Sequence, residues 1–149
     1  MGPDAPIAAL MRTDVITAPP DARLHDVRRL MIEHRIHHVP VVDGDRLLGL
    51  LSATDLLEIG GAAGAGDPAE VAAFLDRRHP IAQAMRRDLV TIGPDRSVRH
   101  AAALLQGGTF HALPVVDPEG RLLGIVTAGD LLRVLAALPS DPAALLQGA

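Results

Sequence analysis

The chain contains two copies of one sequence unit. Residues 7–57 align with residues 81–132 at an offset of 74, which rises to 75 after one inserted residue in a turn. The two stretches are identical at 22 of the 51 positions of the first copy. The period is too long and the copies are too few for an open solenoid. We therefore expect two similar units that pack face to face around one shared core.

Both copies begin with the same predicted elements. Short β-prone stretches at 15–17 and 89–91 are each followed by a Pro-Asp pair, whose aspartates Asp21 and Asp95 suit the N-cap of a helix. Apolar residues at helical spacing then predict an amphipathic helix in each copy. These residues are Leu24, Val27, Leu30 and Met31 in the first copy and Val98, Ala101, Leu104 and Leu105 in the second.

The second half of each copy predicts a hairpin and a closing helix. Buried strands at 39–42 and 113–116 precede tight turns and second strands at 47–51 and 122–126. Ser52-x-x-Asp55 and Thr127-x-x-Asp130 then open the closing helices as capping boxes. Each unit is thus predicted to have the order β-α-β-β-α, which gives an α+β chain of α/β type.

The remaining segments predict the domain limits. We expect a first domain over 7–66, a linker helix over 67–80, a second domain over 81–138 and a tail over 139–149. Residues 60–66 are rich in glycine, and Asp67-Pro68 is a helix-start signal. The apolar face of the linker helix would be Val71, Phe74 and Leu75.

Composition excludes several classes of function. The chain has no Cys, and all 14 basic residues are Arg. Thiolate metal sites, thiol nucleophiles and Schiff-base lysines are therefore excluded. A net charge of −4 and only two aromatic residues, Phe74 and Phe110, argue against nucleic-acid binding. No apolar run approaches the 18 residues that span a bilayer, and no targeting signal is recognised. We expect a cytoplasmic protein that does not bind membranes.

Three repeated motifs carry a resemblance to a known family. The first is M-x-x-D-[VL]-[VI]-T-x-x-P-D, the second ends in P-V-V-D, and the third is R-L-L-G-[LI]-[LV]-[ST]-A-x-D-L-L. Each occurs twice in the same order. This pattern resembles tandem cystathionine-β-synthase (CBS) domains, the pair known as a Bateman module. The resemblance implies a pseudo-twofold pair that commonly forms homodimers and that binds adenine nucleotides or S-adenosylmethionine between its units as regulatory ligands, with no required cofactor.

The resemblance also implies which residues line two clefts. Asp130 and Asp55, beside Thr127 and Ser52, would accept hydrogen bonds from the ribose hydroxyls of a ligand in addition to capping their helices. The base would lie against backbone and aliphatic side chains in each cleft. The first cleft would use Ile16, Ala22, Val27, Ile36 and Ile125; the second would use Leu50, Val90, Ala101 and Phe110, with Arg96 in place of Ala22.

A phosphate group would need cationic partners, and the two copies differ there. The stretch from Arg35 to Pro40 contains His37 and His38, whereas the second copy keeps only His111. Two equivalent phosphate sites are therefore not expected. Because an unperturbed histidine is mostly neutral at pH 7, such a contact would strengthen toward acid pH.

Two other functions are alternatives to ligand sensing. The spacing His34-x-x-His37 could hold zinc, but it lacks the catalytic glutamate position of known metalloprotease motifs, and no other catalytic motif is present. We therefore expect neither a metal site nor an enzyme. The alternative is a ligand-free module that dimerises and contacts another protein. In both interpretations a regulatory function such as energy sensing would act through a separate effector protein.

Overall fold

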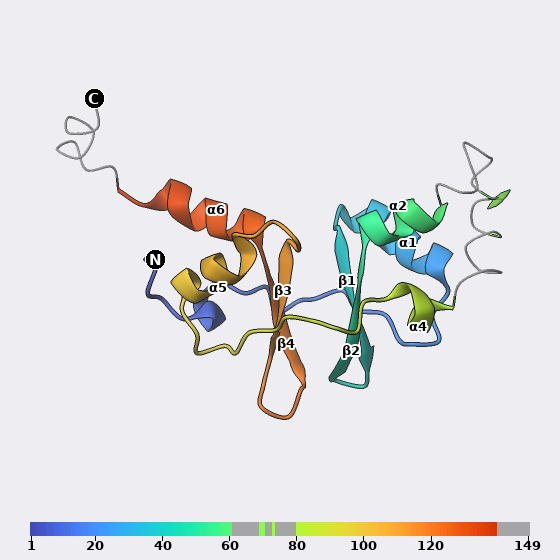
Figure 1. The fold of residues 1–149 in the computed structure, drawn as a ribbon, viewed down its shortest axis with the longest axis horizontal. Helices are drawn as coiled ribbons and strands as arrows, with labels where there is room; N and C mark the ends of the chain where they lie inside the picture. Colours follow the sequence, from blue (N-terminus) through green and yellow to red (C-terminus); the bar gives the residue numbers. More distant parts are fainter. Residues whose placement is uncertain (61–68, 71–72, 74–79, 140–149) are drawn as a thin grey trace.

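The computed structural model describes residues 1–60, 69–70, 73 and 80–139 (Figure 1). Most of the predicted linker helix, including Val71, Phe74 and Leu75, and the tail from residue 140 lie outside the described residues. The first copy contributes η1 (Ile7–Ala9), α1 (Leu24–His34), β1 (His38–Asp43), β2 (Arg46–Ser52) and α2 (Ala53–Gly60). The second copy contributes α4 (Ile81–Ala84), α5 (Val98–Leu105), β3 (Ala112–Val116), β4 (Leu122–Thr127) and α6 (Ala128–Ala137).

The two predicted hairpins are confirmed. β1 pairs with β2 and β3 pairs with β4, both antiparallel and both with a register shift before the last pairs. Gly44 and Gly120 turn the chain with φ of +63° and +84°, a region in which other residues are strained. The strands are almost fully buried at their centres, where Val39, Val41 and Leu51 have no exposed surface.

The predicted first strands at 15–17 and 89–91 are not strands. Each is an extended segment that ends in one isolated parallel bridge, from Ala18 to Val41 and from Ile92 to Val115. Two hydrogen bonds hold the Ala18 bridge, one to the Pro40 carbonyl and one from the Val42 N–H. The ladder does not extend upstream because its next bond would need the N–H of Pro40 in β1 or of Pro114 in β3, and proline has no N–H to donate.

The predicted N-caps of the first helices are wrong by two residues. Asp21 and Asp95 lie in turns, whereas the N-cap residues are Arg23 for α1 and Ser97 for α5. The Ser97 hydroxyl accepts a hydrogen bond from the His100 N–H at 3.1 Å, while Arg23 provides no side-chain cap. The apolar faces agree with the prediction, since Leu24, Val27 and Met31 of α1, and Val98, Ala101 and Leu105 of α5, are buried.

The leading segment of each copy, residues 7–12 in the first and 81–86 in the second, packs into the other copy. Ile7 belongs to the hydrophobic core built by α5, β3, β4 and α6, whereas Ile81 and Met85 belong to the core built by α1, β1, β2 and α2. The backbone of Arg12 exchanges two hydrogen bonds of 3.0 Å with Ile125. The backbone of Arg86 exchanges two of 2.9 Å with Leu50 in the same way.

Two repeated glycines permit this exchange. A Cβ at Gly124 would lie 2.6 Å from the Arg12 carbonyl oxygen, and a Cβ at Gly49 would lie 2.9 Å from that of Arg86. These distances are too short for any other residue. The glycine of the R-L-L-G motif is therefore required for the close approach of the neighbouring backbone.

The expectation of one shared core is wrong in detail, because each unit has its own core. A third and smaller cluster joins them, with Leu50, Ala112 and Ile125 buried and Val15 and Leu89 packed against it. Figure 1 shows the two hairpins side by side at the centre of the molecule and the helices at the two outer ends. The hairpin turns also bond to each other, through Leu47 N to Gly120 O and Leu122 N to Asp45 O. Within the described ranges, no helix is long and apolar enough to cross a bilayer.

Candidate functional site

Asp55 and Asp130 occupy equivalent positions in the first turns of α2 and α6. The Ser52 N–H donates to Asp55 Oδ2 at 3.1 Å, and the Asp55 N–H donates to the Ser52 hydroxyl at 3.0 Å. Thr127 and Asp130 make the same reciprocal pair at 2.9 and 3.3 Å. The predicted capping boxes are therefore confirmed. The second carboxylate oxygen, Oδ1, takes no part in the cap and faces the other copy.

An arginine from the other copy meets each of these Oδ1 atoms. Arg86 Nε lies 3.3 Å from Asp55 Oδ1, and Arg12 Nη2 lies 3.4 Å from Asp130 Oδ1. Arg12 and Arg86 occupy the same position of the repeat, immediately after the methionine of the first motif. The exchanged leading segments therefore bring one cation from each copy to the carboxylate of the other.

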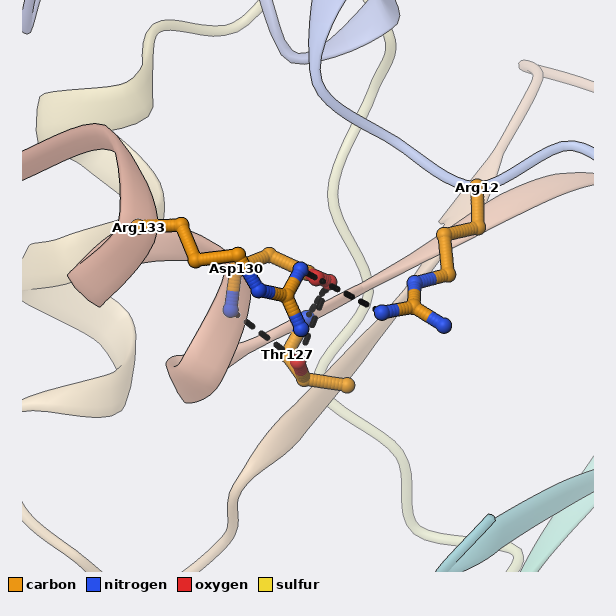
Figure 2. Close-up of polar contacts among 4 residues, drawn as sticks. All are labelled: Arg12, Thr127, Asp130 and Arg133. Carbon is orange, nitrogen blue, oxygen red and sulfur yellow. Dashed lines mark hydrogen bonds and ion pairs between the residues drawn. The ribbon is translucent and has the colours of Figure 1, made fainter. Parts of the chain in front are cut away.

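The two carboxylates differ in a third partner. Arg133, three residues after Asp130 in α6, donates from Nη1 to Asp130 Oδ1 at 2.6 Å (Figure 2). The corresponding residue three positions after Asp55 is Glu58. The Asp130 side chain is 2% exposed, compared with 10% for Asp55. Burial alone would raise the pKa of Asp130, but hydrogen bonds from Thr127 and the two guanidinium groups hold that pKa below its usual value.

A pocket opens beside Asp55, between α2 and the strand that begins at Ala112. Its volume is about 120 Å³, which is below the roughly 300–1,000 Å³ of common ligand sites. The floor is apolar, from Leu50 and Phe110, and the polar groups face it from both copies. The lining residues are His38, Leu50, Ser52, Thr54, Asp55, Arg86, Thr109, Phe110, His111 and Ala112.

Two of the lining residues of this pocket are histidines. His38 and His111 both line it, and each comes from the start of its own hairpin. Burial is the main cause that lowers the pKa of His38, and His37 and His111 lower it further, while Asp55 acts in the opposite direction. His38 is therefore mostly neutral at pH 7. Among the described residues, no group of three histidine or acidic side chains could hold a metal ion.

The structure brings six of the predicted site residues together in this pocket: Leu50, Ser52, Asp55, Phe110, His111 and His38. None of the other predicted site residues lines it. Val27 and Ala101 are fully buried in the two cores, Val90 is 42% exposed, and Arg96 is an exposed residue before α5 whose carbonyl accepts from Ile7.

The residues predicted for the first cleft are divided between the two units. Ile125 is buried in the junction cluster, Thr127 caps α6, and Ile36 packs against the first core. Ala22 also packs against the first core, and Ile16 is half-buried in the extended segment. His37 is exposed and its carbonyl accepts from the Ala53 N–H, while Pro40 is buried in β1 and pairs with Leu50.

The prediction missed four residues of the pocket: Thr54, Arg86, Thr109 and Ala112. Arg86 is the most consequential, because it makes the ion pair with Asp55. A signal for it was present in the sequence, since Met-Arg recurs at 11–12 and 85–86. Only the exchange of the leading segments, however, places this arginine at the other copy's carboxylate.

The profile of the CBS domain matches residues 7–61 and again residues 81–137. The chain belongs to the CBS domain family. Among curated relatives, this CBS pair is 32% identical over 124 residues to protein MJ1225 of Methanocaldococcus jannaschii, covering 83% of this chain and 44% of that protein. It is 32% identical over 118 residues to an inosine-5'-monophosphate dehydrogenase of Korarchaeum cryptofilum, covering 79% of this chain and 22% of the enzyme. The chain thus spans less than half the length of either relative.

Solved CBS structures have the same fold. The CBS domain pair of protein MJ0100, in complex with 5'-methylthioadenosine and S-adenosyl-L-methionine, has a TM-score of 0.71 and 26% identity, over 90% of this chain and 98% of that one. The crystal structure of MJ1225 has a TM-score of 0.76 and 28% identity, over 91% of this chain and 49% of that one. The predicted α+β pair of CBS units is therefore confirmed.

Proposed function

We propose that this CBS pair is a regulatory module that binds an adenosyl ligand, such as AMP, ADP, ATP or S-adenosylmethionine, in the pocket beside Asp55. The observation that carries the proposal is the set of groups around that pocket. Leu50 and Phe110 offer an apolar wall, Asp55 offers a carboxylate oxygen, and His38 and His111 lie nearby. An adenosine phosphate needs an apolar slot, an acceptor for its ribose hydroxyls and cations for its phosphate.

Binding requires Arg86 to leave Asp55. The pocket is too small for a whole nucleotide, and the arginine lies at the oxygen that the ribose hydroxyls would use. The Arg86–Asp55 contact is long, at 3.3 Å, and the ribose hydroxyls would donate to the same carboxylate oxygen in place of the guanidinium. Once released, the guanidinium would be available to a phosphate group.

The relatives support the same ligand class. The MJ0100 pair holds two adenosyl compounds, and its match extends over almost the whole of both chains. The match to inosine-5'-monophosphate dehydrogenase covers only a fifth of that enzyme. A regulatory rather than catalytic activity for this chain is consistent with both. The output would pass to a partner protein that responds to the ligand-bound form.

Thermal melting with AMP, 5'-methylthioadenosine and S-adenosylmethionine tests the proposal. A ligand at 100 times its dissociation constant should stabilise the chain by about 2.7 kcal/mol, which is roughly 5–10 °C for a protein of this size. Asp55→Asn should abolish the shift. The charge-matched control is Asp43→Asn at the exposed end of β1, which should keep it. No shift with any adenosyl compound would contradict the proposal.

A second candidate function is the ligand-free dimerisation module. An apolar groove of about 440 Å³ runs between α5 and α6, and Leu132 and Leu135 beside it are each 64% exposed. Helix faces of this kind commonly pack against a second protein surface. A homodimer is therefore expected, and sedimentation equilibrium measures it. A chain that is monomeric at micromolar concentration would contradict this second function and leave ligand binding untouched.

A further inference from the structure

Asp55 and Asp130 are related by the repeat, but their carboxylate oxygens are not in the same state. Among the described residues, Asp55 Oδ1 has one cationic partner, Arg86, at 3.3 Å. Asp130 Oδ1 has two, Arg133 at 2.6 Å and Arg12 at 3.4 Å. A carboxylate oxygen accepts about two hydrogen bonds. Asp130 Oδ1 therefore has no free acceptor position, while the described residues leave one free at Asp55 Oδ1.

We propose that the module binds one adenosyl ligand per chain, beside Asp55, and that Arg133 keeps the equivalent position beside Asp130 closed to a second ligand. This inference rests on the proposed function. It assigns to Arg133 the selection between two positions that the repeat would otherwise make equivalent.

The geometry of Arg133 makes this closure persistent. Arg133 and Asp130 lie three residues apart on α6, so their side chains meet without any movement of another element. The charge-assisted bond of 2.6 Å is shorter than either of the bonds from the other copy. If Arg133 moved away, a carboxylate with 2% exposure would lose its shortest cationic contact. A ribose hydroxyl is neutral and would replace that contact poorly.

The first copy has the opposite arrangement. Glu58 occupies the position of Arg133, so the helix that carries Asp55 supplies no cation to it. Arg86 comes from the other copy and lies farther from its carboxylate, at 3.3 Å, and Asp55 is more exposed than Asp130. Displacing Arg86 therefore costs less than displacing Arg133. The pocket described above opens on this side.

Isothermal titration with AMP, at fixed pH and salt, gives the number of sites. We expect one AMP per chain for the unaltered protein. Arg133→Ala leaves Asp130 with Arg12 alone, the same state that Asp55 has with Arg86, and should raise the number to two. Glu58→Arg is the reciprocal variant. It places an arginine three residues after Asp55 and should weaken binding at the original site at least tenfold.

The outcomes separate this inference from the proposed function. Two sites in the unaltered protein would leave ligand binding intact and refute the closure by Arg133. One site that persists in Arg133→Ala, with unchanged circular dichroism, would refute it as well. Absence of heat and of any melting shift with all three adenosyl compounds would overturn the proposed function and this inference together. If Arg133→Ala unfolds, Glu58→Arg still decides, because unchanged affinity in that variant contradicts the closure.

Discussion

Gly124→Ala should detach the leading segment of the first copy from the second unit. The new Cβ would lie 2.6 Å from the Arg12 carbonyl oxygen and 2.9 Å from Met11 Sδ. The sulfur could move, but the carbonyl is held by its hydrogen bond from the Ile125 N–H at 3.0 Å. Overpacking of this kind costs about 1–3 kcal/mol. Loss of the two Arg12–Ile125 hydrogen bonds adds roughly 1 kcal/mol each. The sum is about 3–5 kcal/mol.

Urea denaturation followed by circular dichroism measures this loss. We expect the free energy of unfolding to fall by about 3–5 kcal/mol, and the melting temperature to fall by about 10 °C. Gly129→Ala is the matched control, since its new Cβ has no neighbour closer than 3.7 Å. That control lies in the first turn of α6 and should be neutral or stabilising by up to about 1 kcal/mol. A folded Gly124→Ala variant that loses less than about 1 kcal/mol would show that the close approach is not required.

Three further predictions concern charge and capping. The lowered pKa of Asp130 means that its carboxylate stabilises the fold above about pH 4, the value in the unfolded chain, and that this stabilisation is lost as pH falls through the lower pKa of the folded state. In urea unfolding, the difference in free energy of unfolding between the unaltered chain and Asp130→Asn should therefore shrink from pH 6 to pH 3. A constant difference would contradict this expectation. Because burial lowers the pKa of His38, its charge appears only at acid pH, so the ratio of AMP affinities between the unaltered chain and His38→Gln should rise from pH 7.5 to pH 5.5; a flat ratio would exclude His38 from phosphate binding. Ser97→Ala should destabilise α5 by about 1 kcal/mol, whereas Arg23→Ala at the equivalent cap of α1 should not, because only Ser97 accepts a backbone N–H; equal losses would contradict the capping assignment.

Local patterns in the sequence predicted the elements that depend on local chemistry. The hairpins follow from buried β-prone runs on either side of an Asp-Gly turn in the first copy and an Asp-Pro-Glu-Gly turn in the second. The capping boxes follow from the spacing of Ser52 and Asp55 and of Thr127 and Asp130. The stretches at 15–17 and 89–91 have the composition of strands. They stay outside the ladders because continuing the pairing upstream would need N–H groups from Pro40 and Pro114, which prolines lack.

The parts that the sequence did not predict depend on contacts between the copies. Ile7 and Ile81 have the same apolar character in any arrangement, so periodicity cannot indicate which core each one enters. The same exchange brings Arg86 to Asp55, which explains why this pocket residue was missed. Most residues around the pocket were predicted because Asp55 belongs to a repeated motif and the resemblance to the family implied Phe110 and His111. Their arrangement in one pocket required the structure.

The exchange of leading segments makes each half of the chain dependent on the other. A polypeptide cut within residues 61–68 would give two fragments, and neither would carry the leading segment that fills its own hydrophobic core. The first fragment lacks Ile81 and Met85, and the second lacks Ile7. Each fragment would therefore stay largely unfolded when alone, and the two together would rebuild both cores. The two copies therefore fold as one cooperative unit, because each hydrophobic core contains residues from both.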